Sequence, residues 1–134
     1  MGRSQGGSSS AHRVRRILVV DDEDTIREAL VDILKDSGYE AVGAINGRDG
    51  LRKLHEARTP FSLILLDLTM PVLDGRGFRL QQRRDPAVAG IPVVVVSAYR
   101  DVAVLAADLE AAAYLSKPLN LPALLEIVRK QLPA

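Results

Sequence analysis

Residues 17–22 read Ile-Leu-Val-Val-Asp-Asp, four consecutive apolar residues followed at once by two acids. A short, uninterrupted apolar run rich in β-branched residues predicts a strand that is buried on both faces. The pattern recurs at 63–67 (Leu-Ile-Leu-Leu-Asp) and at 91–97 (Ile-Pro-Val-Val-Val-Val-Ser), where a polar residue again follows the last apolar one. Strands of this kind are typical of parallel sheets that helices cover on both sides.

Segments with helical periodicity separate these strands. After the first strand, apolar residues recur at helical spacing at Ile26, Ala29, Leu30, Ile33 and Leu34. Weaker strands are expected at 39–44 and 114–115, and further helices at 50–57, near 78–80, at 102–109 and at 121–132. Five strand–helix units predict an α/β fold, a (βα)5 doubly wound, parallel five-stranded sheet with helices on both faces.

Residues that favour helix ends and turns predict where individual helices begin and end. Gly38 suits the left-handed position after the first helix. Asn120 is expected to cap the last helix, with Pro122 in its first turn. We also expect Asp22 or Asp24 to cap the first helix, and Asn46-Gly47 to form a turn.

The composition limits the function classes. With 134 residues and no cysteine, the chain has the size of one domain and has no disulfide framework, thiolate zinc site or cysteine nucleophile. Its longest uncharged apolar run, residues 102–107, is far too short to span a membrane, and the N-terminus lacks the apolar core of a signal peptide. The expected location is therefore cytoplasmic. No Gly-Lys-Ser/Thr phosphate-binding motif is present, which excludes a P-loop nucleotide enzyme.

The net charge of +1 conceals an uneven distribution. Residues 1–16 contain four arginines and no acid, so the remaining residues carry a net charge of −3. The first residues are also rich in Gly and Ser and lack apolar periodicity. We predict a flexible, basic tail over 1–14 and a single folded domain over 15–134.

Polar residues that could take part in binding or catalysis follow four of the predicted strands: Asp21 and Asp22, Asp67, Ser97 and Lys117. Each has an ordinary interpretation on its own, as an acid before a helix, a turn residue or a solvated lysine. The carboxyl ends of parallel strands meet at one edge, however, and sites form there. We therefore expect these side chains to lie together.

Three converging carboxylates repel one another, by about 4 kcal/mol per pair at roughly 4 Å and an effective dielectric constant of about 20. Lys117 supplies one compensating charge, and a hard divalent cation with oxygen ligands, such as Mg²⁺, supplies two. A cation, a lysine and a hydroxyl around a carboxylate meet the needs of phosphoryl transfer. The carboxylate itself can act as the nucleophile and form an aspartyl phosphate.

These residues form an ordered set of motifs: Ile17 to Glu23, Leu65 to Pro71 with Asp74-Gly75, Pro92 to Ala98, and Tyr114 to Pro118. On these motifs the chain resembles the receiver domain of two-component response regulators, the CheY-like, flavodoxin-like fold, over about residues 15–132. The resemblance implies the strand order 2-1-3-4-5. It also implies a phosphoprotein of a two-component system or phosphorelay, which catalyses only its own phosphoryl transfer and autodephosphorylation.

The resemblance assigns roles in the acidic pocket. Asp67 matches the phosphoacceptor, which takes a phosphoryl group from a kinase phosphohistidine and also binds the metal. Asp22 matches the acid that binds Mg²⁺ (or Mn²⁺) directly, and Asp21 matches the neighbour that acts through water. The backbone carbonyl of Thr69 matches the third protein ligand.

The resemblance also implies a switch. Ser97 matches the hydroxyl that bonds the phosphoryl group, Lys117 the lysine that pairs with it, and Tyr114 the aromatic residue that turns inward as Ser97 moves. The Lys117–Pro118 bond is usually cis in the family. Thr69 and Tyr99, each two residues after a pocket residue, should border the path of an attacking water and tune the lifetime of the phosphate.

Partners follow from the same resemblance. A sensor histidine kinase or phosphotransfer protein is expected to dock near the first helix. A downstream effector, or an output domain outside these residues, is expected on the face of the fourth helix, fifth strand and fifth helix. Residues 101–116 contain no basic residue that could form charged contacts across a dimer, so we expect a monomer or weak dimer. We also expect no membrane contact and no direct nucleic-acid binding.

Two alternatives remain open. A pseudo-receiver would be an interaction module without phosphorylation, although such a module should lack one of the acids or the lysine. An aspartate-dependent phosphatase of the haloacid dehalogenase type needs a second acid two residues after its nucleophile, where this chain has Thr69. One departure concerns the fold: the family usually has a glycine where this chain has Glu110, so the fourth helix is expected to end differently.

Overall fold

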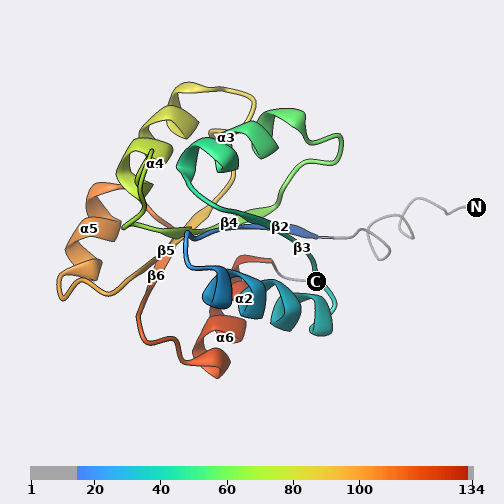
Figure 1. Cartoon of the computed structure of the whole chain (residues 1–134), viewed down its shortest axis with the longest axis vertical. Coiled ribbons are helices and arrows are strands. Elements are labelled where there is room, and N and C mark those ends of the chain that lie inside the picture. Colours follow the sequence, from blue (N-terminus) through green and yellow to red (C-terminus); the bar gives the residue numbers. More distant parts are fainter. Residues whose placement is uncertain (1–14, 133–134) are drawn as a thin grey trace, which may run out of the picture.

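The computed structural model describes residues 15–132, over which five parallel strands alternate with five helices (Figure 1). The strands are β2 (Arg16–Val20), β3 (Glu40–Ala44), β4 (Leu63–Asp67), β5 (Val93–Ser97) and β6 (Ala113–Ser116). The helices are α2 (Asp24–Asp36), α3 (Gly47–Glu56), α4 (Gly75–Arg84), α5 (Val102–Asp108) and α6 (Leu121–Gln131). The sheet order β3-β2-β4-β5-β6 is the 2-1-3-4-5 order, so the predicted fold is confirmed. The basic tail predicted over 1–14 lies outside the described residues.

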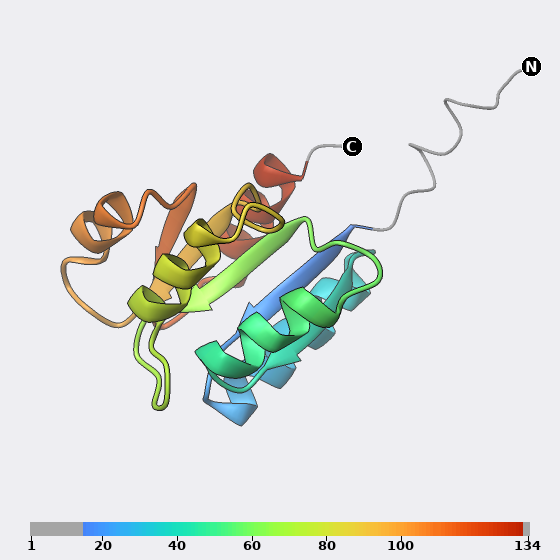
Figure 2. The same ribbon diagram turned by 90° about the horizontal axis from the view of Figure 1, so that it is seen from above.

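Two helical layers enclose the sheet. Helices α3, α4 and α5 cover one face and α2 and α6 cover the other, as Figures 1 and 2 show from two directions. Phe78 and Val102 lie in the core beneath the first layer, and Leu34 and Leu124 in the core beneath the second. All residues of β4 and β5 are buried, as expected for central strands covered on both faces. Between residues 15 and 132, no helix combines the length and apolar character needed to cross a membrane.

Two helix ends follow the local sequence signals. Gly38, which follows the C-cap residue Ser37 of α2, adopts the left-handed conformation with φ +97°. Asn120 caps α6 through its side chain, which accepts a hydrogen bond from the amide of Ala123, and Pro122 lies in the first turn. Both expectations are confirmed.

Two other helix starts differ from expectation. Neither Asp22 nor Asp24 caps α2: the residue before the helix is Glu23, whose side chain makes no capping hydrogen bond. The Glu23 amide donates to the Asp21 carboxylate within the loop (2.9 Å). Helix α3 begins at Gly47, since the side chain of Asn46 accepts the amide of Asp49 (2.8 Å) and caps the helix. Gly47 is required there, because a Cβ atom would lie 2.5 Å from the carbonyl oxygen of Leu73.

The end of α5 contradicts the expectation drawn from Glu110. Glu110 adopts the left-handed conformation that the family usually gives to glycine, with φ +53°. The guanidinium of Arg79, a buried residue of α4, donates to the carbonyl oxygens of Leu109 and Glu110, both at 2.9 Å, and to Oε1 of Gln82 at 2.8 Å. A helix C-terminus leaves carbonyls without partners. Arg79 supplies those partners and supports the strained residue.

A Glu110→Gly variant is expected to be more stable than the wild type by about 0.5–1 kcal/mol in urea unfolding. Relief of left-handed strain contributes roughly 1–2 kcal/mol. The lost ion pair with Arg83 (2.9 Å) offsets less than about 1 kcal/mol, since both side chains are largely exposed. Glu110→Ala, which removes the ion pair but keeps the strain, is the control. An equal gain from alanine would contradict the explanation.

Candidate functional site

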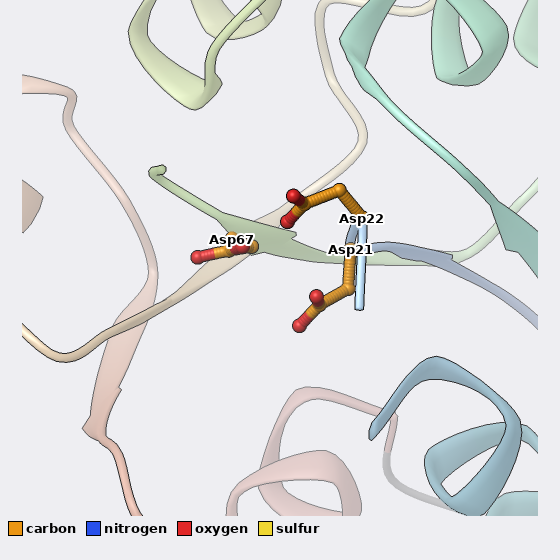
Figure 3. Close-up of side chains that lie close together, drawn as sticks. All are labelled: Asp21, Asp22 and Asp67. Carbon is orange, nitrogen blue, oxygen red and sulfur yellow. The ribbon is translucent and has the colours of Figure 1, made fainter. Parts of the chain in front are cut away.

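Three carboxylates gather where β2 and β4 end. Asp21 and Asp22 follow β2, Asp67 closes β4, and the neighbouring residues Val20 and Leu66 are register partners. One carboxylate oxygen from each acid lies within 4.8 Å of the other two, and Figure 3 shows the three side chains together. Asp21 and Asp67 are buried, at 2% and 4% exposure. The predicted convergence of the acids is therefore present.

Lys117, the residue that follows β6, places a positive charge beside these acids. Its amide donates to the carbonyl of Ser97 (2.9 Å), which places the residue beside the end of β5. Its ammonium lies 3.2 Å from Asp21, 3.2 Å from Glu23 and 3.7 Å from Asp67. Burial lowers the pKa of Lys117, but the carboxylates of Asp67 and Asp21 outweigh it and raise the pKa above its ordinary value. The ammonium therefore stays charged. The peptide bond from Lys117 to Pro118 is cis.

The single positive charge of Lys117 does not balance the negative charges of the three acids. Burial, followed by the charge of Asp21, raises the pKa of Asp67 to about 6, against the lowering effects of Lys117 and of the Thr69 amide, which donates to Asp67 at 3.3 Å. A hard divalent cation suits this environment, because the donor set within the described residues consists of three carboxylate oxygens with no thiolate or imidazole. The residues present therefore fit Mg²⁺ or Mn²⁺.

Ser97, Tyr99 and Tyr114 are the other side chains predicted to act at this site. The Ser97 side chain is buried at the end of β5, and its Oγ accepts the amide of Tyr99 (3.0 Å). Tyr114 lies on β6 with 46% of its surface exposed, and Tyr99 is 50% exposed. Tyr99 also lines a cavity of about 290 Å³ with Leu68 and Leu105. Among the described residues, no hydrogen bond or ion pair joins Ser97 or either tyrosine to the acids.

The structure adds two residues that the sequence did not single out. Glu23 shares the ammonium of Lys117 with Asp21 and Asp67. Arg27, on α2, donates to the backbone carbonyl of Asp21 (2.9 Å). The sequence gives no signal for the Glu23 contact, since its partner lies 94 residues away.

Comparison with known families and structures is consistent with this geometry. Residues 17–129 match the response regulator receiver domain family. A receiver protein from Pseudomonas putida superposes with a TM-score of 0.81 at 35% identity, covering 88% of this chain and 98% of the other. The TrrA response regulator of Thermotoga maritima, solved in complex with Mg²⁺ and BeF, gives a TM-score of 0.78 at 33% identity, covering 89% of this chain and all of the other.

Sequence relatives are longer proteins. A probable transcriptional regulator, ycf27 of Cyanophora paradoxa, is 38% identical over 108 residues, which cover 79% of this chain and 43% of the relative. The transcriptional regulatory protein PdtaR of Mycobacterium tuberculosis is 34% identical over 117 residues, covering 85% of this chain and 55% of the relative. The chain thus spans about half the length of such relatives.

Proposed function

Since this chain belongs to the family of response regulator receiver domains of two-component systems, we propose that Asp67 accepts a phosphoryl group in a reaction that depends on Mg²⁺ or Mn²⁺. One observation carries the proposal: Asp67 is a buried carboxylate at a strand end, grouped with two further acids and within 3.7 Å of a charged lysine. With a pKa of about 6, its carboxylate is mostly ionised at pH 7 and available as a nucleophile. The proposed receiver unit covers residues 15–134.

In the proposed step, an oxygen of Asp67 attacks the phosphorus of a phosphohistidine. The new P–O bond replaces the P–N bond, and the imidazole leaves with the bonding electron pair. Asp21, Asp22, Asp67 and the carbonyl of Thr69 would hold the cation, which neutralises phosphoryl oxygens when bound. Lys117 leaves Glu23 and pairs with the transferred group, since its ammonium already lies beside Asp67.

The proposed switch starts at Ser97. A phosphoryl group brings a charge of about −1.5 to −2 and new acceptor oxygens. The Ser97 hydroxyl leaves the Tyr99 amide and donates to the phosphoryl group, and Tyr114 turns inward into the space that this movement opens. The face formed by α5, β6 and α6 then changes shape.

The proposed partners follow from this cycle. A sensor histidine kinase or phosphotransfer protein docks near α2 and supplies the phosphoryl group. An effector or an output domain reads the face of α5, β6 and α6. We place the protein in the cytoplasm as a monomer or weak dimer that catalyses only its own phosphorylation and dephosphorylation, without direct contact to membrane or nucleic acid.

Intact mass measurement tests the proposal. The protein is incubated with a small phosphodonor and Mg²⁺, and the wild type is expected to gain one acid-stable, base-labile phosphoryl group. Asp67→Asn is expected to gain none, and Asp36→Asn, which changes an exposed acid at the end of α2, is expected to behave as the wild type. A wild type without adduct would indicate a pseudo-receiver, and turnover of many phosphomonoesters would indicate a phosphatase. An undiminished adduct on Asp67→Asn would also contradict the proposal.

The exposed Tyr99 is expected to protect the phosphorylated form. Its ring lines the cavity beside Leu68, the residue after Asp67, and excluding water from a site slows hydrolysis of a reactive intermediate. Tyr99→Ala should therefore speed loss of the phosphoryl group by more than about twofold, measured after removal of the phosphodonor. Leu80→Ala is the control, because Leu80 is an equally exposed large side chain, at 51%, that lies on α4. A Tyr99→Ala rate within twofold of the wild type would exclude the shielding role.

A further inference from the structure

One side chain of α2 holds the loop that carries Asp21 and Asp22 from outside the acidic group. Nη1 of Arg27 donates to the backbone carbonyl of Asp21 (2.9 Å), and Nη2 donates to the carboxylate of Asp24 (2.5 Å). The Arg27 side chain is 12% exposed, whereas that of Asp24 is 77% exposed. A surface ion pair of that kind contributes little. The contact with the Asp21 carbonyl is therefore the informative one.

That carbonyl belongs to the peptide group between Asp21 and Asp22. Its orientation sets ψ of Asp21 and φ of Asp22, and hence the direction in which each carboxylate leaves the backbone. The loop is fixed on its other sides by the Asp21 amide, which donates to Ala44 (3.1 Å), and by the Asp21 carboxylate, which accepts the Glu23 amide (2.9 Å). Arg27 fixes the peptide group that these two contacts leave untouched.

Strand β3 leaves room for this side chain at Gly43. A Cβ atom at Gly43 would lie 3.0 Å from Cδ and 3.1 Å from Cγ of Arg27, closer than ordinary contacts allow. Gly43 does not have a positive φ, so the backbone there does not require glycine. The absent side chain instead lets the Arg27 stem cross the edge of the sheet and reach the loop.

We infer that Arg27, seated over Gly43, is a positioning residue for the metal-binding acids: its hydrogen bond to the Asp21 carbonyl fixes the peptide group that directs Asp21 and Asp22 toward the cation. The inference rests on the proposed function, because the cation belongs to that function. The inference predicts that removing Arg27 changes the affinity for the cation in the direction opposite to that expected from charge alone. Removing a positive charge beside an acidic group should strengthen cation binding, whereas loss of positioning should weaken it.

Titration of the metal-free protein with Mn²⁺, with free Mn²⁺ followed by electron paramagnetic resonance, tests the inference without any activity readout. Arg27→Ala is expected to weaken binding by about tenfold, as the loss of an outer-shell partner does. Gly43→Ala keeps every charge but displaces the Arg27 stem, and is expected to weaken binding by roughly threefold. The double variant should bind no more weakly than Arg27→Ala alone, because both changes disturb one contact.

Lys53→Ala is the matched control, because Lys53 donates to the carbonyl of Gly43 (2.6 Å) from the same region and does not contact Asp21. It is expected to bind Mn²⁺ as the wild type does. Urea unfolding without metal shows that each variant is folded, and Gly43→Ala remains informative if Arg27→Ala does not fold. If the Arg27 and Gly43 variants bound Mn²⁺ as tightly as the wild type or more tightly, the inference would be overturned and the proposed function would stand. A wild type that binds no Mn²⁺ would overturn the proposed function and the inference with it.

Discussion

Without metal at pH 7, Asp67→Asn is expected to raise the free energy of unfolding by about 1–3 kcal/mol. Burial and the neighbouring Asp21 raise the pKa of Asp67 to about 6, from an ordinary value of 3.8. Each pKa unit corresponds to about 1.4 kcal/mol of difference between the protonation states, so the ionised carboxylate opposes folding. Asparagine has nearly the same shape and carries no charge, so it removes this penalty.

The pH dependence has a defined sign. Below about pH 4, Asp67 is protonated in both the folded and the unfolded state and has no differential effect. Between about pH 4 and pH 6 the unfolded chain ionises first, so the folded state binds more protons and the wild type loses stability as the pH rises. The gain from Asp67→Asn should therefore grow across this window and level off above it. Mg²⁺ should stabilise the wild type more than the variant, because it binds the ionised carboxylate.

Urea unfolding from pH 3.5 to 7.5, with a chelator and then with Mg²⁺, measures both effects. Asp49→Asn is the matched control, because its pKa shifts the other way. Burial raises the pKa of Asp49, but the Ile45 amide, Arg52 and Lys53 lower it below its ordinary value. Asp49→Asn should therefore destabilise the protein at pH 7 and lose that effect as the pH falls. Equal pH profiles for the two variants would contradict the assignment of Asp67.

The central part of the fold and site is predictable because it depends on local patterns and one topological rule. The apolar runs before Asp21 and Asp67 define central strands, and parallel strands bring their carboxyl ends to one edge. The convergence of three acids and Lys117 then follows without knowledge of side-chain geometry. Gly38 and Asn120 are predictable for a similar reason, since each acts on residues adjacent in sequence.

The rest depends on partners distant in the chain. Asn46 caps α3 through a local contact with the Asp49 amide, but the need for glycine at position 47 depends on the Leu73 carbonyl in the loop after β4. The left-handed Glu110 depends on Arg79, whose position on α4 gives no sign in the sequence that its side chain is buried. The sequence likewise presents Arg27 as an ordinary residue of an amphipathic helix, because its close approach to Gly43 depends on the tertiary structure. In each case a contact across more than about ten residues decides a local feature.

The largest loss of stability is expected from Arg79→Ala, by about 2–4 kcal/mol in urea unfolding. The change leaves the Leu109 and Glu110 carbonyls and Oε1 of Gln82 without their donor, and a buried acceptor without a partner costs roughly 1–3 kcal/mol. A cavity adds to this cost, because Arg79 is only 7% exposed. Arg79→Met, which restores apolar volume without donors, should recover the cavity contribution and leave the hydrogen-bond loss.

A double-mutant cycle tests whether Arg79 supports the strained end of α5. Combined with Glu110→Gly, Arg79→Ala should cost about 1 kcal/mol less than it does alone, because glycine accepts the left-handed conformation without help. Arg83→Ala is the control, since it removes a partner of Glu110 that is largely exposed and should change stability by less than about 1 kcal/mol. If Arg79→Ala were no more destabilising than Arg83→Ala, the buried guanidinium would not be the support of this helix end. If the stability changes of Arg79→Ala and Glu110→Gly were strictly additive, Arg79 would stabilise the protein elsewhere, through its contact with Gln82. The Gln82 side chain in turn joins α4 to the Val88 and Ile91 carbonyls.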